Sequence, residues 1–153
     1  MHSLPHHYSA AADGAAEGAV RVTAGDRIAL DTAPPPEFGG PEGEWSPEHL
    51  LVASVADCFV LSFRAVARAS RLEWAGLRCD VEAVLDRDDE RVTRFVAFSV
   101  RPRLTLAADE DRERAEKCLD KAKRHCLITN SLNARVDLEP EIVVAGQSRA
   151  ATG

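Results

Sequence analysis

The fold is decided by residues 46–69, which read SPEHLLVASVADCFVLSFRAVARA. Ser46 is a preferred residue just before a helix, Pro47 suits the first helical position, and Glu48 complements the positive end of the helix dipole. Behind them, only four polar residues interrupt an apolar run that continues to Ala67. The pattern predicts a helix over 47–69, about 34 Å long, and a helix that is apolar nearly all round is a buried one.

The length and charge of the chain limit what can surround this helix. The chain has 153 residues, which is the size of one domain, so we expect a single domain over 1–153. One subunit of this size has difficulty covering every side of such a long apolar helix, and we therefore expect a homodimer. The net charge of −6 is opposite in sign to a nucleic-acid-binding surface, so no nucleic-acid partner is expected.

The remaining elements follow from hydrophobic alternation and from turn residues. We expect an N-terminal arm or weak edge strand over 1–18, a hairpin over 20–30, a loop over 34–43, strands over 77–85 and 92–106, a helix over 109–124, a closing strand over 136–144 and a frayed tail over 146–153. Pro102 cannot donate to a strand ladder, so it is expected at an edge or a bulge. Because strands and helices do not alternate strictly, the order predicts an α+β fold rather than a parallel α/β sheet.

The N-terminus carries neither a basic segment nor an apolar segment of the kind that directs export, so a cytoplasmic location is expected. No uninterrupted apolar run approaches 18 residues, and on that ground a membrane-spanning helix is excluded. Four cysteines in a chain of this kind are expected to be thiols rather than a disulfide framework.

Two of the four cysteines are candidates for chemistry, although core packing remains an alternative for each. Cys58 lies in the middle of the apolar helix, and Cys126 directly follows His125, where nearby cations would favour a thiolate. Cys79 and Cys118 lie on apolar faces, which favours packing. The eight-residue interval between Cys118 and Cys126, without a second ligand pair, does not match a structural metal site, and no nucleotide-binding or cofactor-binding motif is present.

Four segments of the sequence resemble the OsmC/Ohr family, which comprises osmotically inducible protein C and the organic hydroperoxide resistance proteins. They read PEFGG at 36–40, WSPEHLL at 45–51, ADCF at 56–59 and AKRHCLITNSL at 122–132. The resemblance implies an OsmC-like fold, in which antiparallel sheets pack on the two long central helices of an intertwined homodimer.

The resemblance also implies a function, namely reduction of organic hydroperoxides through a two-cysteine disulfide cycle that defends against oxidative stress. Cys58 matches the peroxide-attacking position and Cys126 the resolving position. A dithiol reductant, such as a lipoylated protein, would restore both thiols, and no cofactor is implied. Apolar residues such as Phe59, Leu61 and Phe63 are expected to line the cleft.

Glu48 matches a family glutamate that pairs with an arginine at the site. It precedes Cys58 by ten residues, or about 15 Å along one helix, so it cannot contact that thiol directly. The positions where the family carries its arginine fall at Glu17 and near Phe38 in this chain. A second hypothesis therefore stays open, in which an OsmC-fold protein without peroxidase activity binds an apolar small molecule at the dimer cleft.

Overall fold

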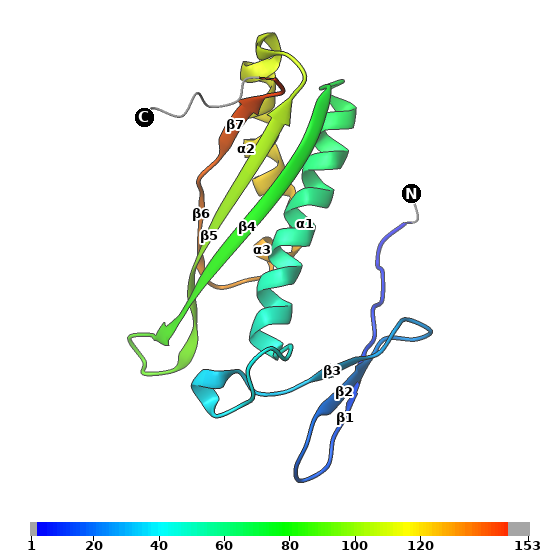
Figure 1. Cartoon of the computed structure of the whole chain (residues 1–153), viewed down its shortest axis with the longest axis vertical. Helices are drawn as coiled ribbons and strands as arrows, with labels where there is room; N and C mark the ends of the chain where they lie inside the picture. Colours follow the sequence, from blue (N-terminus) through cyan, green and yellow to red (C-terminus); the bar gives the residue numbers. More distant parts are fainter. Residues whose placement is uncertain (1–2, 147–153) are drawn as a thin grey trace. The chain divides into compact units, whose positions relative to one another are not determined.

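The computed structural model of the chain describes residues 3–146 (Figure 1). The expected tail over 146–153 therefore lies, apart from Gly146, outside the described residues. Contacts divide the chain into two compact units, one that ends at Leu51 and one that begins at Val52, and each is described by itself. We call them the N-terminal unit and the C-terminal unit.

The N-terminal unit contains a three-stranded antiparallel sheet. Its strands are β1 (Ala11–Asp13), β2 (Val20–Thr23) and β3 (Leu30–Thr32), in the order β1-β2-β3. Val20 pairs with Thr32, and the Thr32 hydroxyl donates to the Val20 carbonyl over 3.2 Å. Ile28, which we expected in the hairpin, instead lies outside the strands and is 93% exposed.

The loop that follows β3 turns tightly at Gly40. A 3-10 turn, η1 (Pro36–Phe38), opens this loop, and the Gly40 amide donates to the Pro35 carbonyl over 3.1 Å. A β-carbon at position 40 would collide with the backbone carbonyl of Pro34. The second glycine of the PEFGG segment is therefore required by space rather than by dihedral freedom.

Helix α1 (Pro47–Ala69) begins where the sequence predicts it. The His49 amide donates to the Ser46 hydroxyl over 3.2 Å, which is the bond that an N-capping serine makes. One face of the helix is buried, and its residues are Val55, Phe59, Phe63, Val66 and Ala67. Leu61 on another face is 50% exposed, so a single chain does not bury the helix on all sides.

The C-terminal unit is built on a four-stranded sheet. It comprises β4 (Trp74–Arg87), β5 (Thr93–Leu106), β6 (Arg135–Leu138) and β7 (Glu141–Val144). The long strands β4 and β5 form an antiparallel hairpin, whereas β6 and β7 both run parallel to β5. The single closing strand expected over 136–144 is thus wrong, because Glu139 and Pro140 separate two short strands.

Pro102 lies at this interruption, in a central strand rather than at an edge. The carbonyls of Val100 and Leu106 accept hydrogen bonds from Glu139 and Ala145, so even-numbered residues of β5 direct their backbone polar groups towards β6 and β7. β6 pairs with β5 up to Val100 and β7 pairs from Arg103, which leaves position 102 between them. The missing N–H of Pro102 therefore leaves no ladder bond unmade.

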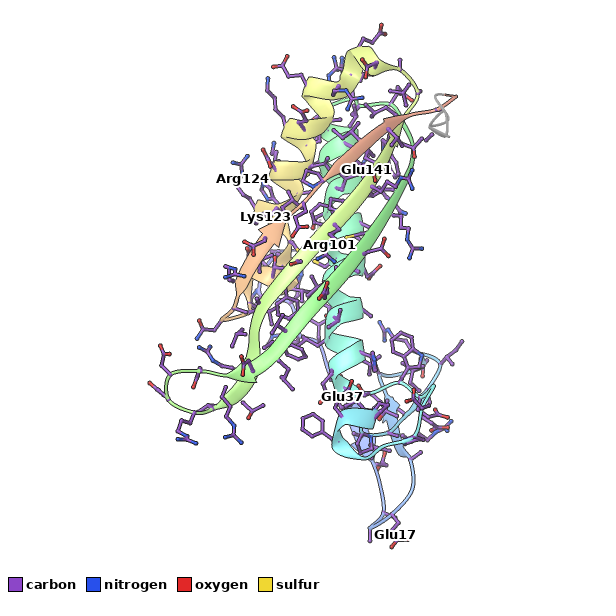
Figure 2. The ribbon with its side chains drawn as sticks, turned by 60° about the vertical axis from the view of Figure 1, so that its left-hand side comes forward. Glu17, Glu37, Arg101, Lys123, Arg124 and Glu141 are labelled. Atoms are coloured by element: carbon purple, nitrogen blue, oxygen red, sulfur yellow. The ribbon has the colours of Figure 1, made fainter. Side chains whose placement is uncertain are left out.

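Helices cover one face of this sheet, and ion pairs cover the other. A short turn, η2 (Asp109–Asp111), leads into α2 (Arg112–His125), which is followed by α3 (Leu127–Asn130). Figure 1 shows α1 and α2 running along the β4–β5 hairpin, and the Phe63 ring meets the Trp74 ring edge-on at 5.4 Å. On the outward face, Arg101 contacts Glu82 at 2.8 Å and Glu139 at 3.2 Å (Figure 2).

The core of the unit lies between the helices and the sheet. Its largest fully buried apolar side chains are Phe59, Phe63, Phe98, Leu104, Leu106 and Leu119. The α2 stripe predicted from sequence is buried as expected, and it includes Cys118 and Cys126. The molecule is therefore an α+β protein, as the element order predicts.

The exclusion of a membrane helix on run length is too strong. Helix α1 has the length and the mean hydropathy, 1.9, of a segment that could cross a membrane, and only 28% of its most apolar window is buried inside the protein. One such helix is weak evidence for a membrane, because the core helix of a non-membrane protein has the same properties. The expectation of no membrane partner stays a prediction.

Candidate active site

Cys126 occupies the junction between two helices of the C-terminal unit. It ends α2, where its amide donates to the Lys123 carbonyl over 3.3 Å, and it precedes the first residue of α3. Its backbone is extended, with φ −70° and ψ 105°, and its side chain is 1% exposed. The thiol is therefore held inside the unit at a point where the chain changes direction.

The thiols of Cys58 and Cys126 lie close enough for each to affect the other. Cys58 lies half-buried on α1, 68 positions before Cys126, and the fold brings the two sulfurs together. Burial is the main factor that raises the pKa of the Cys126 thiol, and its hydrogen bond to Cys58 and the charge on Cys58 raise the pKa further. Cys126 therefore keeps its proton at neutral pH.

Thr129 is a member of this site that sequence reasoning did not single out. Its hydroxyl and backbone N–H approach the Cys126 sulfur, and both interactions lower the pKa of that thiol against the effect of burial. The hydroxyl also lies 3.1 Å from the Cys126 carbonyl, to which it donates. The sequence signal for Thr129 is its position three residues after Cys126, because a threonine hydroxyl can donate a hydrogen bond to the carbonyl three residues before it.

The other two cysteines behave as packing residues. Cys118 is 2% exposed on the buried stripe of α2. Cys79 lies on the helix-facing side of β4 opposite Pro102, and burial, with the charges of Asp80 and Cys126, raises its pKa to about 12. Cys79 is therefore protonated at neutral pH and a poor nucleophile, although it lies close enough to Cys126 for their charges to interact.

Glu48, the third residue predicted at the site, belongs to the N-terminal unit. It lines a pocket of about 530 Å³ in that unit, and its Oε2 atom is buried without a hydrogen-bond partner among the described residues. Neither Glu17 nor Phe38 supplies a positive charge, and Phe38 lines the same pocket. The glutamate is thus present, whereas the expected arginine partner is missing from these positions.

The expected cleft lining needs a correction. Phe59 and Phe63 are 2% and 0% exposed in the core of the C-terminal unit, while Leu61 is half exposed on a different face of α1. The three side chains therefore do not line one open cleft in the single chain. Their spacing of two residues places successive members about 200° apart around a helix, which explains the separation.

Among residues 3–146, no three His, Cys, Asp or Glu side chains are placed to hold a metal ion. The chemistry of the site is that of its two thiols, Cys58 and Cys126. A thiolate beside a protonated thiol can attack an oxidant, and the second sulfur is then within reach of the oxidised first one.

Comparison with known proteins identifies relatives of this fold. Residues 39–141 match the family described as OsmC-like protein. An uncharacterised *Bacillus subtilis* protein, YmaD, is 26% identical over 113 residues, covering 72% of this chain and 75% of that protein. An organic hydroperoxide resistance protein from *Legionella pneumophila* is 27% identical with a TM-score of 0.72, covering 93% of this chain and all of that one. An OsmC-like protein of unknown function from *Vibrio cholerae* is 18% identical with a TM-score of 0.81, over 89% and 99% of the two chains.

Proposed function

Because the chain belongs to the OsmC-like protein family, we propose that it is a thiol-dependent peroxidase that reduces organic hydroperoxides. The observation that carries the proposal is that the fold brings the thiols of Cys58 and Cys126, 68 positions apart in the sequence, close enough to interact. Similarity to an organic hydroperoxide resistance protein supports organic hydroperoxides as the substrate class. The family match spans both cysteines and Glu48.

The chemistry uses each thiol once in a cycle. The Cys58 thiolate attacks the terminal oxygen of the hydroperoxide, the O–O bond breaks, and the alcohol leaves with a proton as Cys58 becomes a sulfenic acid. The sulfur of Cys126 then attacks Cys58, water leaves and a disulfide forms. An external dithiol, such as a lipoyl group on another protein, reduces this disulfide by exchange and becomes oxidised itself.

The raised pKa of Cys126 supports this division of labour. A thiol that keeps its proton is the weaker nucleophile of the two, which suits Cys126 to the second, resolving step. Cys126 lies at a helix junction, so only the α2–α3 connection must adjust when the two sulfurs bond. We propose that Glu48 helps to position the peroxide from the assembled dimer.

Mass spectrometry after addition of one equivalent of cumene hydroperoxide tests the proposal. Wild type should form a Cys58–Cys126 disulfide, Cys58→Ser should consume no peroxide above the uncatalysed rate, and Cys126→Ser should stop at Cys58 sulfenic acid. Cys79→Ser is the matched control, since it removes a thiol near the pair and should leave the disulfide unchanged. Peroxide turnover by Cys58→Ser would show that the proposal is wrong.

We also propose a homodimer. Most of the apolar stretch of α1 is not buried within one chain. Among residues 3–51, Pro35 is the one apolar residue that is fully buried. A second copy would cover such surfaces, as buried apolar area favours association. Light scattering at micromolar concentration should give twice the mass of 16.6 kDa, and a stable folded species at 16.6 kDa would contradict the dimer.

Thiols that cycle need a reducing environment, so we propose a cytoplasmic location. Fractionation of cells should find the protein with cytoplasmic markers, and recovery from a membrane or secreted fraction would contradict the proposal.

A further inference from the structure

The C-terminal end of α2 carries a cluster of positive charges. Lys121, Lys123 and Arg124, which we call the basic cluster, lie within four residues, next to one acid, Asp120. Among residues 3–146, the side chains of these three cations form no ion pair. Figure 2 shows Lys123 and Arg124 on α2. Earlier cations of the same helix are all paired, namely Arg112 with Asp109, Arg114 with Asp111 and Lys117 with Glu113.

The basic cluster lies directly before one of the two thiols. Cys126 follows Arg124 by two positions, and the next residue, Leu127, is 73% exposed. Lys121 and Arg124 are exposed, and Lys123 is half-buried. The end of a helix favours cations, so the cluster stabilises α2. Because these charges are open to solvent beside an exposed apolar side chain, they also form a surface that an acidic protein fits by charge.

A groove between α1 and α2 begins at this surface. Its volume is about 270 Å³, and its lining residues are Ser62, Ala65, Val66, Ala69, Lys121 and His125. The Ser62 hydroxyl donates to the His125 carbonyl over 3.4 Å, which joins the two helices at the groove. Cys58 precedes Ser62 by four residues and Ala65 by seven, so the three lie on one face of α1. The groove therefore follows the helix face that carries Cys58, and its small side chains leave room for an unbranched chain.

We propose that the basic cluster docks an acidic protein whose dithiol arm lies in this groove and reduces the Cys58–Cys126 disulfide. The proposal rests on the thiol cycle proposed above, and it adds that the site selects acidic carriers of the dithiol. Cys58 is the more accessible sulfur, since it is half-buried whereas Cys126 is 1% exposed.

Access therefore sets the order of the exchange. One thiolate of the arm attacks Cys58, Cys126 leaves and takes up a proton, and a mixed disulfide forms. The second thiol of the arm, as thiolate, then displaces Cys58, which takes up the other proton. The protein gains two electrons and two protons, and the arm ends as a disulfide.

The attraction is local, because the chain as a whole is acidic. Residues 1–51 contain eight acidic residues and two arginines, which account for the whole net charge of −6. At about 0.1 M salt, exposed charges more than about 10 Å apart are largely screened. A partner that contacts the basic cluster should then respond to the cluster, whereas the net charge of the chain would favour a basic partner.

Three synthetic peptides that carry the same dihydrolipoyl-lysine test the proposal on the full-length protein. Their flanking residues are glutamate, glutamine or lysine, and the protein disulfide is first formed with diamide, so no peroxide is needed. Alkylation and mass spectrometry count the thiols released with time. Each rate is divided by the rate of the same peptide with hydroxyethyl disulfide, which corrects for the effect of the flanking charges on the dithiol itself.

At about 0.1 M salt, the glutamate peptide should reduce the protein about fivefold faster than the glutamine peptide, as a few exposed ion pairs would give. The lysine peptide should be the slowest of the three. The differences should disappear in 1 M sodium chloride. Equal corrected rates, or the lysine peptide as the fastest, would overturn the proposal.

Two variants of equal charge separate the basic cluster from the general field of the protein. The first combines Lys121→Gln, Lys123→Gln and Arg124→Gln, and it should lose the preference for the glutamate peptide while the glutamine peptide still reduces it. The second combines Arg101→Gln, Arg103→Gln and Arg135→Gln on the outward face of the sheet, and it should keep the preference.

The remaining outcomes are also decisive. Loss of the preference in both variants, or in neither, would show that the basic cluster is not the docking surface. If diamide forms no Cys58–Cys126 disulfide, the proposed thiol cycle is wrong and this proposal falls with it. If the disulfide forms but peptide charge has no effect on its reduction, the docking proposal alone is wrong.

Discussion

The two units of this chain differ in how fully they bury their apolar side chains and in their net charge. The C-terminal unit has a closed core with fully buried phenylalanines and leucines, and its acidic and basic residues are equal in number. The N-terminal unit has strands of three or four residues, carries all of the net charge, and leaves Ile28, Phe38 and Trp45 exposed. Short strands with little buried area are only marginally stable alone. The proposed dimer accounts for this difference, because a second copy would cover the apolar side chains that the N-terminal unit leaves exposed.

The largest effect that would test this difference is loss of a core ring. Phe63→Ala should lower the free energy of unfolding by about 3–5 kcal/mol, because a fully buried phenylalanine is replaced by a cavity beside Trp74. Val22→Ala, in the N-terminal sheet, should cost below about 1 kcal/mol in a dilute, ligand-free sample. Urea denaturation measures both. Equal costs would mean that the two units are equally well packed.

A second substitution acts on the N-terminal unit without touching the core. Gly40→Ala should cost about 1–3 kcal/mol, since its β-carbon would collide with the Pro34 carbonyl and the loop must move. Gly76→Ala is the control, because space around that glycine is open. If Gly40→Ala unfolds at the same urea concentration as wild type, the loop is less constrained than the structure indicates.

Alkaline pH should act on the C-terminal unit through Cys79. The pKa of this thiol rises from 9.0 to about 12 on folding, so its contribution to stability is complete below pH 9 and is lost as pH rises towards 12. The fall in Tm between pH 8 and pH 11 should be about 2–4 °C smaller in Cys79→Ala than in wild type. Comparing the fall in Tm of the two proteins removes the effect of any packing that Cys79→Ala loses at both pH values. An identical fall in both proteins would place Cys79 in solvent.

The smallest effect belongs to the outward ion pairs. Arg101→Gln removes the contacts with Glu82 and Glu139, which are about half exposed, and should lower Tm only slightly at low salt. The cost should shrink in 1 M sodium chloride because exposed charges are screened. Calorimetric Tm at the two salt concentrations measures it. A cost that does not change with salt would show that Arg101 acts by packing rather than by charge.

The elements that sequence predicts well are those whose stabilising contacts are local. The α1 boundaries follow from the Ser46-Pro47 cap, and the stripe of α2 follows from helical spacing. The alternation of β4 is correct from Leu77 to Ala83, but a register shift between Val84 and Leu85 leaves Leu85 exposed. A bulge depends on the facing strand, which the alternation of one strand does not reveal.

The site shows the same limit. Cys58 and Cys126 could be identified by motif resemblance, but their contact depends on the packing of α1 against the end of α2. The expected arginine could not be found because its place is taken by Glu17 and Phe38, and the unpaired state of Glu48 became visible only with its pocket. The split of the closing strand could have been read from Pro140, which cannot donate to a ladder.

The interruption beside Pro102 also affects how the sheet moves. Because β6 and β7 each hold β5 through four paired residues, neither depends on the other for its register. Local opening can therefore release one of them while the other stays paired, whereas β4 and β5 share a ladder of 13 residue pairs and open together. Amide protons of β7 would then exchange with solvent on a shorter timescale than those in the middle of the β4–β5 hairpin. Pro102 therefore lies opposite the gap between β6 and β7, where the edge of the sheet is divided into two strands that can open independently.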